Sequence, residues 1–421
     1  MCRPLWYFIS SLQGITRFKR FDNFINGFLI KEDLMSIQNY KGFSRDAKLV
    51  IAYSFIAWLG GNISYFILPF YYSSLGMSFS EIGVLFSIST LVEAIILLVS
   101  GHISVKLGYR RTILFSVGMF FIARLLQVFI PEFWVFAIAS AILGVGMALE
   151  MPALMSLLSE EASEEKRHYL FSLNAALGTM GSALGMYLGG ALPNLLDGSN
   201  PYKMTLLVAT LLIPLQGLFI FLVSPVLKRE EKRLKLEKEL VIKIAKFSLP
   251  SALIGLGAGV TIPYIGLWFN KRFGTSLESI GGLFAIQEFI MGIGMFTLPM
   301  ISDKIGSVRT IVGFDGSASL LIFAMPFSPV FPVAAVVYTI RTILMNIVNP
   351  IWDAFMMRFF TTEERSTAIA LRSFAWTTTH ALGQFMGGRI FDISLTWPFL
   401  ITGALYGLSM FSFWVLFAKE E

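Results

Sequence analysis

Three acidic residues lie inside long apolar runs of this sequence, where a charged side chain is unexpected. Glu93, Glu150 and Glu288 each have apolar stretches on both sides. A charged side chain at the centre of a lipid bilayer costs about 2.5–3.5 kcal/mol on insertion scales, so it is rarely kept without a use or a partner. A carboxyl group held away from water can take up and release protons. We therefore predict that these three acids carry protons.

Other charged residues in apolar runs offer an alternative, which is a static ion pair. The pairs we consider are Glu93 with Arg124 and Glu288 with Arg341. We expect Arg341 to contact a solute or to change partner between conformations, because its charge is otherwise hard to explain in an apolar run. Arg124 and Asp315 are interpreted as structural.

Polar and aromatic residues in the same runs are candidates for lining an internal cavity. Unpaired amides are poorly tolerated in lipid, and aromatic rings can form an amphipathic wall, although many of the 40 Phe and 8 Trp must face lipid. The predicted cavity residues are Arg341, Asn62, Tyr65, Tyr264, Trp268, Asn346, Asn349 and Trp376. Further candidates are Trp58, Tyr338, Gln287 and His380.

The composition shows what kind of element must position these residues. Hydrophobic residues make up 55% of the 421 positions, charged residues make up 14%, and the mean hydropathy is +0.71. A soluble domain has about 25% charged residues. The apolar runs are about 20 residues long, which is the length of a membrane-spanning helix, and backbone groups in lipid must be satisfied within the span. The sequence therefore predicts an all-α membrane protein.

The predicted spans form two sets of six, separated by one long charged segment. The first set covers 49–73, 79–101, 110–130, 133–157, 168–194 and 203–226, and the second covers 248–270, 279–300, 308–327, 330–352, 366–390 and 396–418. We predict an amino-terminal segment over 1–45, a six-helix bundle over 46–226, a charged linker over 227–247, a second bundle over 248–418 and a tail over 419–421.

The distribution of Lys and Arg predicts the orientation, because cytoplasmic loops retain these residues. With both termini and the linker in the cytoplasm, 27 of the 33 Lys and Arg lie on the cytoplasmic side. We expect a multi-pass protein of the plasma membrane. The net charge of +6 follows from this bias and requires no nucleic-acid partner.

The first 34 residues have two interpretations. Phe18, Phe21, Ile25 and Phe28 recur at helical spacing beside basic residues, which is typical of an amphipathic helix on an anionic membrane surface. The alternative is that Met35 is the true start.

An internal repeat covers much of the chain. "ISVKLGYRRTI" at 103–113 and "ISDKIGSVRTI" at 301–311 are identical at seven of eleven positions and lie 198 residues apart. At the same offset, "SEIGVLFSI" at 80–88 matches "ESIGGLFAI" at 278–286, and "ALGMYLGG" at 183–190 matches "ALGQFMGG" at 381–388. Because six is even, both copies enter the membrane in the same direction. Parallel repeats with a site between them are one plan of secondary transporters.

These residues carry a resemblance to the major facilitator superfamily, over about residues 46–418. The family's signature between its second and third helices is a glycine, an acid, a basic residue, a second glycine and further basic residues. In the first copy Val105 replaces the acid, and in the second Pro299 replaces the first glycine. The matching positions are Gly101, Lys106, Gly108, Arg110 and Arg111, and then Asp303, Lys304, Gly306 and Arg309.

The signature also has a physical interpretation. Gly108 and Gly306 permit a tight turn between helices, and the arginines that follow can bond carboxylates across helix ends. Asp353 is the expected partner of Arg309, while Met155 occupies the equivalent position in the first copy. We predict an ion-pair latch in the second half only. The alternative is that these charges only follow the positive-inside rule.

Glycines at intervals of four residues predict close helix packing in both copies, because they leave one helix face nearly without side chains. They are Gly181, Gly185, Gly189, Gly190, Gly383, Gly387 and Gly388. The resemblance to proton-coupled exporters of the family is partial, because Met186 stands where those exporters have proline.

Several other classes of protein are not indicated. Cys2 is the single cysteine, the three histidines are scattered, and the chain has no phosphate-binding loop and no triad typical of an enzyme. We expect no cofactor and no metal, and a monomeric protein.

The resemblance and the buried charges together predict a secondary transporter of a small organic solute that works by alternating access. Proton-coupled efflux of amphipathic compounds is the leading expectation. The alternative is uptake, by symport or facilitated diffusion, of a polar or anionic metabolite held by Arg341. A receptor or scaffold without transport activity is a third interpretation, but it would need neither buried charges nor duplicated signature motifs.

Overall fold

The fold is described from a computed structural model that covers residues 42–161, 166–196, 198, 200–225, 238–294, 305–361 and 363–420. The predictions for the amino-terminal segment, for the start of the linker and for Asp303 and Lys304 lie outside these residues.

The amino-terminal half consists of six long helices. They are α3 (Arg45–Ser74), α4 (Phe79–Leu107), α5 (Tyr109–Phe129), α6 (Phe133–Glu160), α7 (Arg167–Leu195) and α8 (Pro201–Phe221). The start of α4 shows how the sequence sets these boundaries: Ser78 and Glu81 form a reciprocal capping box that satisfies free N–H groups of the first turn. Gly76 and Gly108 have positive φ in the turns on either side of α4, a conformation that glycine adopts at low cost.

The carboxy-terminal half repeats this plan with interrupted helices. Its elements are α9 (Lys238–Thr261), η2 (Ile262–Tyr264), α10 (Ile265–Phe273), α11 (Leu277–Gly294), α13 (Ser307–Ala324), η3 (Met325–Phe327), α14 (Phe331–Ile347), α15 (Asn349–Met357), α16 (Arg365–Ile393) and α17 (Trp397–Phe417). Pro263 lies in η2 and Pro350 opens α15. Proline lacks the N–H that a continuous helix needs, but proline alone does not cause a break, since Pro152, the equivalent of Pro350 in the first half, lies inside the unbroken helix α6.

The helices confirm the predicted fold class. Counting α9–η2–α10, α13–η3 and α14–α15 as continuous rods gives twelve helices in two sets of six. Among the described residues, nine of these rods are long and apolar enough to cross a membrane. Helix α9 already begins at Lys238, so the last ten residues of the segment predicted as a linker are helical.

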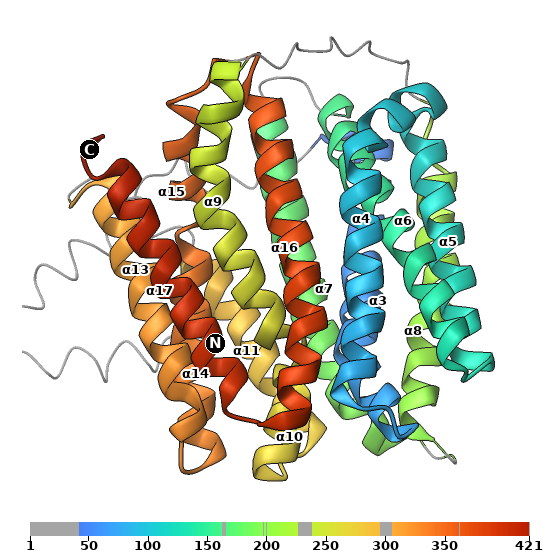
Figure 1. Cartoon of the computed structure of the whole chain (residues 1–421). Coiled ribbons are helices and arrows are strands. Elements are labelled where there is room, and N and C mark those ends of the chain that lie inside the picture. The colour runs from blue at the N-terminus through green and yellow to red at the C-terminus, as the bar shows by residue number, and fades with distance from the viewer. Residues whose placement is uncertain are drawn as a thin grey trace, which may run out of the picture.

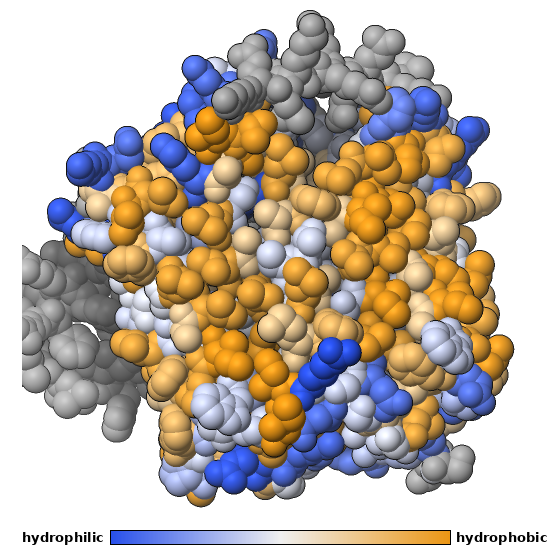
Figure 2. Space-filling model, in the orientation of Figure 1, coloured by the Kyte–Doolittle hydropathy of each residue, from blue (hydrophilic) through white to orange (hydrophobic). Residues whose placement is uncertain are grey.

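The two ends of the bundle are distinguished by the helices that begin there. We call the end where α3, α5, α7, α9, α13 and α16 begin the linker end, and the opposite end the distal end. In Figure 1 the linker end is at the top, and α4 and α16 run side by side between the halves. On the face shown in Figure 2, apolar residues dominate the middle of the molecule and hydrophilic residues lie toward both ends, as expected for a membrane-spanning protein.

The apolar core differs between these ends. One cluster of buried side chains joins both halves toward the distal end and includes Phe66, Phe79, Tyr264 and Phe391. Toward the linker end each half has a cluster of its own, one around Tyr53 and Leu157 and the other around Phe247, Phe355 and Phe413. The halves therefore share a core at the distal end and pack independently near the linker end.

Candidate functional site

Two adjoining cavities lie where the halves face each other. The larger has a volume of about 500 Å³, and its walls come mainly from α3, α4, α6 and α8, with Glu93 and Glu150 among them. The smaller has a volume of about 170 Å³ and lies between α3, α7, η2, α10, α11 and α14, with Glu288 in its wall. Tyr65 and Pro263 line both cavities, so they form the partition between them. All three predicted proton-carrying acids therefore face one of the two cavities.

Two of the three acids, Glu150 and Glu288, have hydroxyl groups and not basic groups as partners among the described residues. Tyr53 of α3 donates a hydrogen bond to Glu150 of α6. Ser182 of α7 lies beside the carboxyl group of Glu288 on α11. None of the ion pairs recorded between described residues involves these acids. The static pairs considered from the sequence, Glu93 with Arg124 and Glu288 with Arg341, are not formed.

Arg124 and Arg341 have other partners. Arg124 donates to Gln127 at 2.7 Å, one turn along the same helix, and it lines the larger cavity. Arg341 is only 4% exposed and lines neither cavity. It donates to the hydroxyl of Tyr406 at 2.6 Å, and its guanidinium lies 5.3 Å from the centre of that ring.

The buried network around Arg341 corrects its predicted role as a cavity residue. Asp315 of α13 is 2% exposed, interacts electrostatically with Arg341 and accepts a hydrogen bond from Trp352 at 3.3 Å. These residues belong to α13, α14, α15 and α17, so the network ties together helices of one half. Depth along the sequence places Arg341 in the membrane but does not say which face of its helix it occupies.

The other predicted cavity residues divide into two groups. Asn62 and Tyr65 line the larger cavity, and Asn62 donates to the carbonyl of Trp58 in its own helix at 2.8 Å. Tyr264 and Trp268 are buried in the shared distal core instead. Their polar atoms donate to the carbonyls of Gln384 and Leu395.

Three further predicted residues also lie outside the cavity walls. Asn346 donates to the carbonyl of Thr342 in its own helix at 2.8 Å, and Asn349 is exposed at the start of α15. Trp376 stacks on His380 with ring centres 4.6 Å apart. His380, not Trp376, reaches the larger cavity.

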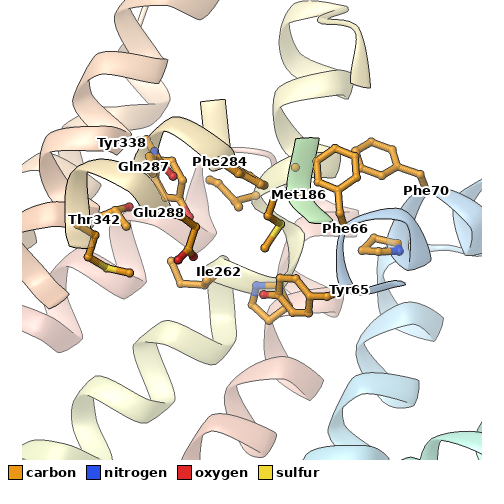
Figure 3. A pocket seen from close by; sticks show the side chains of 15 residues that line it. Tyr65, Phe66, Phe70, Met186, Ile262, Phe284, Gln287, Glu288, Tyr338 and Thr342 are labelled. Atoms are coloured by element: carbon orange, nitrogen blue, oxygen red, sulfur yellow. The ribbon is translucent and has the colours of Figure 1, made fainter. Parts of the chain in front are cut away.

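Several residues of the site could not be identified from the sequence. Tyr53, Phe66, Phe70, Phe284 and Thr342 contact the acids or line the smaller cavity. Each is an ordinary residue of an apolar helix, and only the packing of neighbouring helices selects it. Figure 3 shows this selection, with side chains from both halves converging on one space.

The predicted packing glycines make close helix contacts, and most of these contacts lie within one half. A Cβ atom at Gly181 or Gly185 would lie 2.7 or 2.5 Å from a carbonyl oxygen of α3. A Cβ atom at Gly383 or Gly387 would lie 2.2 or 2.3 Å from a carbonyl oxygen of α9. Gly189 faces the side chain of Phe66 on α3, at 3.0 Å.

The last glycine of each run makes a contact between the halves. A Cβ atom at Gly190 would lie 2.3 Å from the carbonyl oxygen of Leu277 at the start of α11. A Cβ atom at Gly388 would lie 2.3 Å from the carbonyl oxygen of Phe79 at the start of α4. These two pairs are related by the 198-residue offset of the repeat, so the distal end is closed by two equivalent contacts.

Polar groups reinforce the two contacts unequally. The carboxylate of Asp392 on α16 accepts hydrogen bonds from the backbone N–H groups of Phe79 and Ser80, both at 2.9 Å, and from the Ser80 hydroxyl. A carboxylate at a helix N-terminus is favoured by the free N–H groups and by the helix dipole. In the other contact, Asn194 occupies the equivalent position and donates to Glu278 at 3.4 Å.

The signature turns have the predicted backbone, but the arginine after the first of them has unexpected partners. Gly108 and Gly306 have φ of 87° and 90°. Arg110 donates to the backbone carbonyls of Ile220 and Phe221 at the end of α8, not to a carboxylate. Such an interaction satisfies carbonyls left free at a helix C-terminus.

Of the charges in the predicted latch, the structure describes Asp353 and Arg309 but not Asp303. Asp353 forms its ion pair with Arg372 of α16 at 2.7 Å, within one half, and not with Arg309. The Asp353 side chain is 58% exposed. Gly101 and Lys106 lie in the last turns of α4, and Arg111 and Arg309 are exposed.

The architecture defines a class of protein before any comparison is made. Two parallel six-helix repeats share a core at one end, pack separately at the other and enclose cavities with polar groups between them. Such an arrangement is that of a secondary transporter with a site at the interface of its repeats.

The chain belongs to the Major Facilitator Superfamily. The model of that family matches residues 50–383 and 247–421. The protein is therefore a multi-pass membrane transporter and not an enzyme.

Individual relatives are distant. Quinolone resistance protein NorA of Staphylococcus aureus (strain MSSA476) is 23% identical over 367 residues, which cover 82% of this chain and 89% of that protein. The vesicular acetylcholine transporter of Drosophila melanogaster is 20% identical over 351 residues, which cover 79% of this chain and 60% of that protein.

Solved structures show the same fold. The nucleoside transporter NupG superposes with a TM-score of 0.74 at 14% identity, covering 89% of this chain and 99% of that one. A bacterial homologue of the human lysosomal transporter Spinster superposes with a TM-score of 0.69 at 12% identity, with coverage of 89% and 99%.

Proposed function

We propose that this protein couples proton movement to the export of a small amphipathic organic solute by alternating access. The observation that carries the proposal is the pair of adjoining cavities between the halves, with three carboxyl groups in their walls. No described ion pair neutralises Glu93, Glu150 or Glu288. Carboxyl groups in this setting can change protonation state as the cavity changes its access to water.

The size and lining of the larger cavity support an amphipathic solute. Its volume of about 500 Å³ lies within the 300–1,000 Å³ typical of small-molecule sites. Its wall combines apolar residues such as Leu143 and Met147 with a few polar groups, including Asn62 and Gln216. A mainly apolar wall with sparse polar groups favours compounds that carry both kinds of surface.

The alternative of anion uptake loses its main support. That hypothesis required Arg341 to hold the solute, but Arg341 is engaged with Tyr406 and Asp315 and lines neither cavity. Arg124 does line the larger cavity, but its guanidinium donates to Gln127. The two carboxyl groups of that cavity favour a cationic or neutral solute over an anion.

The orientation and setting form part of the same proposal. We take the linker end as cytoplasmic, because Lys and Arg concentrate there, and the distal end as extracellular. The described conformation is then closed to the outside. Both termini are cytoplasmic, the protein resides in the plasma membrane and a monomer is the transporting unit.

The test is transport by purified protein in liposomes with and without an imposed pH gradient, using a panel of amphipathic compounds. Glu150→Gln or Glu288→Gln should abolish accumulation driven by the gradient and leave exchange of solute largely intact. Glu132→Gln, at an exposed carboxylate before α6, is the matched control. Accumulation preserved in both cavity variants would contradict proton coupling through these acids.

A further inference from the structure

The smaller cavity has a lining that the transport proposal does not explain. Aromatic rings form a continuous wall across both halves: the ring centres are 5.4 Å apart for Phe70 and Phe66, 5.9 Å for Phe66 and Phe284, and 5.9 Å for Phe284 and Tyr338. Tyr65 completes this wall. Glu288 is the one carboxyl group among the lining residues, and none of them is Lys or Arg.

The charge of Glu288 has no basic partner nearby among the described residues. Arg341 lies one turn from Tyr338 on α14, but its guanidinium is directed to Tyr406. The hydroxyl of Ser182 is the polar group beside the carboxyl. Figure 3 shows Glu288 and Tyr65 reaching into the same space from opposite sides.

The aromatic wall and the carboxyl group of Glu288 together favour a positively charged ligand. The face of an aromatic ring is electrically negative, so it attracts cations and repels anions, and the attraction strengthens when water is excluded. A carboxylate without a counter-ion adds the same preference. An alkylated ammonium group satisfies both, because its methyl groups contact the rings and its charge faces the carboxylate, whereas a hydrated metal ion needs oxygen ligands.

The volumes decide how much of a ligand enters. About 170 Å³ is below the range for a whole drug-sized molecule, while the adjoining cavity of about 500 Å³ is within it. Tyr65 and Pro263 separate the two spaces and are related by the 198-residue offset of the repeat. A ligand in the larger cavity can therefore extend a small group past Tyr65 toward Glu288.

We propose that the smaller cavity is a subsite for an alkylated ammonium group, held by the aromatic wall and by Glu288, with the rest of the solute in the larger cavity. The inference rests on the proposed function only in taking the larger cavity as the solute site. Proton and ammonium group then compete for the same carboxylate, which gives a direct route to exchange of one for the other.

The test is equilibrium binding to the purified full chain in lipid nanodiscs, with labelled choline as the probe. Its neutral carbon analogue, 3,3-dimethylbutan-1-ol, is the competitor of equal shape. We expect choline to bind and the neutral analogue to displace it at least about tenfold less well than unlabelled choline does. Equal displacement by both compounds would overturn the proposal.

Two kinds of variant locate the binding. Glu288→Gln keeps the shape of the side chain and should weaken choline binding at least about tenfold, while Glu132→Gln should not change it. Phe284→Leu keeps an apolar side chain but removes a ring face, and should weaken binding about 3- to 30-fold. Phe284→Tyr restores the ring and should restore binding. Choline affinity unchanged in Glu288→Gln or in Phe284→Leu would overturn the subsite, and Phe284→Leu decides the matter if Glu288→Gln does not fold.

The outcomes separate this proposal from the proposed function. Charge-selective choline binding that depends on Glu288, in a protein that shows no gradient-driven transport, would leave the subsite standing and reject proton-coupled export. Gradient-driven transport in a protein whose choline binding is absent or insensitive to charge would reject the subsite and leave proton-coupled export standing.

Discussion

The two contacts that close the distal end have the same backbone geometry and different chemistry. Where α16 meets α4, Gly388 brings the helices together and Asp392 binds the free N–H groups of the first turn of α4. Where α7 meets α11, Gly190 makes the same close approach, but Asn194 makes only one long hydrogen bond. Duplication of the sequence therefore preserved the fit between helices while the polar reinforcement diverged.

Buried charged residues also differ in their surroundings between parts of the molecule. In the carboxy-terminal half, Arg341 and Asp315 are enclosed in a network with Tyr406 and Trp352. In the amino-terminal half, Glu93 and Glu150 face a cavity. The first arrangement stabilises a half internally, and the second leaves charge available to a solute.

The largest effect should come from breaking the enclosed network. Arg341→Met removes the donor to the Tyr406 hydroxyl and the cation that acts on buried Asp315, and leaving buried polar groups without partners typically costs about 1–3 kcal/mol, and more for charged groups. Thermal unfolding of the purified protein should report this cost. The double variant Arg341→Met with Asp315→Asn should lose less stability than the sum of the single variants, because it removes both charges. Strict additivity would show that the two residues do not interact.

The next effect concerns the glycines between the halves. Gly388→Ala places a Cβ atom 2.3 Å from a backbone oxygen of the other half, so the distal end should separate. Overpacking of this kind costs about 1–3 kcal/mol, a population shift of roughly 5- to 150-fold. Spin labels on Leu195→Cys and Ile393→Cys, both exposed at the distal end, measure the separation.

The glycine comparison has an internal control. Gly190→Ala should act as strongly as Gly388→Ala, because its Cβ atom would be equally close to Leu277. Gly282→Ala, next to the contact but with nothing within 4 Å, should leave the distance distribution unchanged. A response to only one of the two contact glycines would show that the contacts do not open together.

Substitution of Asp392 should weaken the closure of the distal end less than the glycine substitutions do, and the reverse substitution at Asn194 should not strengthen it. Asp392→Asn keeps an acceptor for the N–H groups of α4 but removes the charge that favours a helix N-terminus, a loss of about 1 kcal/mol. The same spin-label distances should show more of the open form, by roughly fivefold. Asn194→Asp should not strengthen its own contact, because the new carboxylate would face Glu278. If Asn194→Asp stabilised the closed distal end, a carboxylate would reinforce both contacts, and the proposed difference between them would be wrong.

Asp353 tests the linker end and should matter least among the charges. In its ion pair with Arg372, the Asp353 side chain is 58% exposed, while that of Arg372 is 22% exposed, and ion pairs open to solvent on one side contribute about 0–1 kcal/mol. Asp353→Asn should therefore change the unfolding temperature little and should leave the distal distances unchanged. A strong shift of those distances would restore the latch that the sequence predicted.

The linker end of the amino-terminal half should show a weak pH dependence. Partial burial raises the pKa of Glu161 above its usual value, and Asp46 adds to the rise, while a hydrogen bond from Ser44 lowers it. The folded state thus favours the neutral carboxyl group. Its contribution to stability is complete below the usual pKa near 4.5 and is lost as the pH rises through the higher folded value. Unfolding temperatures measured between pH 4 and pH 8 should show this loss in the wild type and not in Glu161→Gln.

The fold was predictable because hydrocarbon imposes length and polarity on each helix. The twelve spans and the turn glycines Gly108 and Gly306 follow from those constraints, and the repeat identifies equivalent positions. The acids of the cavities were predictable for the same reason, since a charge in lipid is costly.

The partners of each residue were not predictable in this way. Arg341 and Glu288 lie in similar apolar runs, but one faces its own half and the other a cavity, and this depends on how each helix is rotated about its axis. Asp392 lies near a helix end, where charge is common, so its capping of a helix more than 300 positions earlier in the chain had no local signature. An alignment of the two copies would have paired it with Asn194, but pairing alone does not reveal a contact.

Two glycines are adjacent near the end of α7 and two near the end of α16. Random substitutions at these positions should produce two distinct kinds of defective protein. Gly189 and Gly387 face their own half, against Phe66 and Val260, so substitutions there should yield protein that is poorly produced and degraded. Gly190 and Gly388 face the other half, so substitutions there should yield protein that accumulates normally but is inactive. Substitutions at two neighbouring positions of one helix would therefore cause different defects, one in the folding of the protein and the other in its transport cycle.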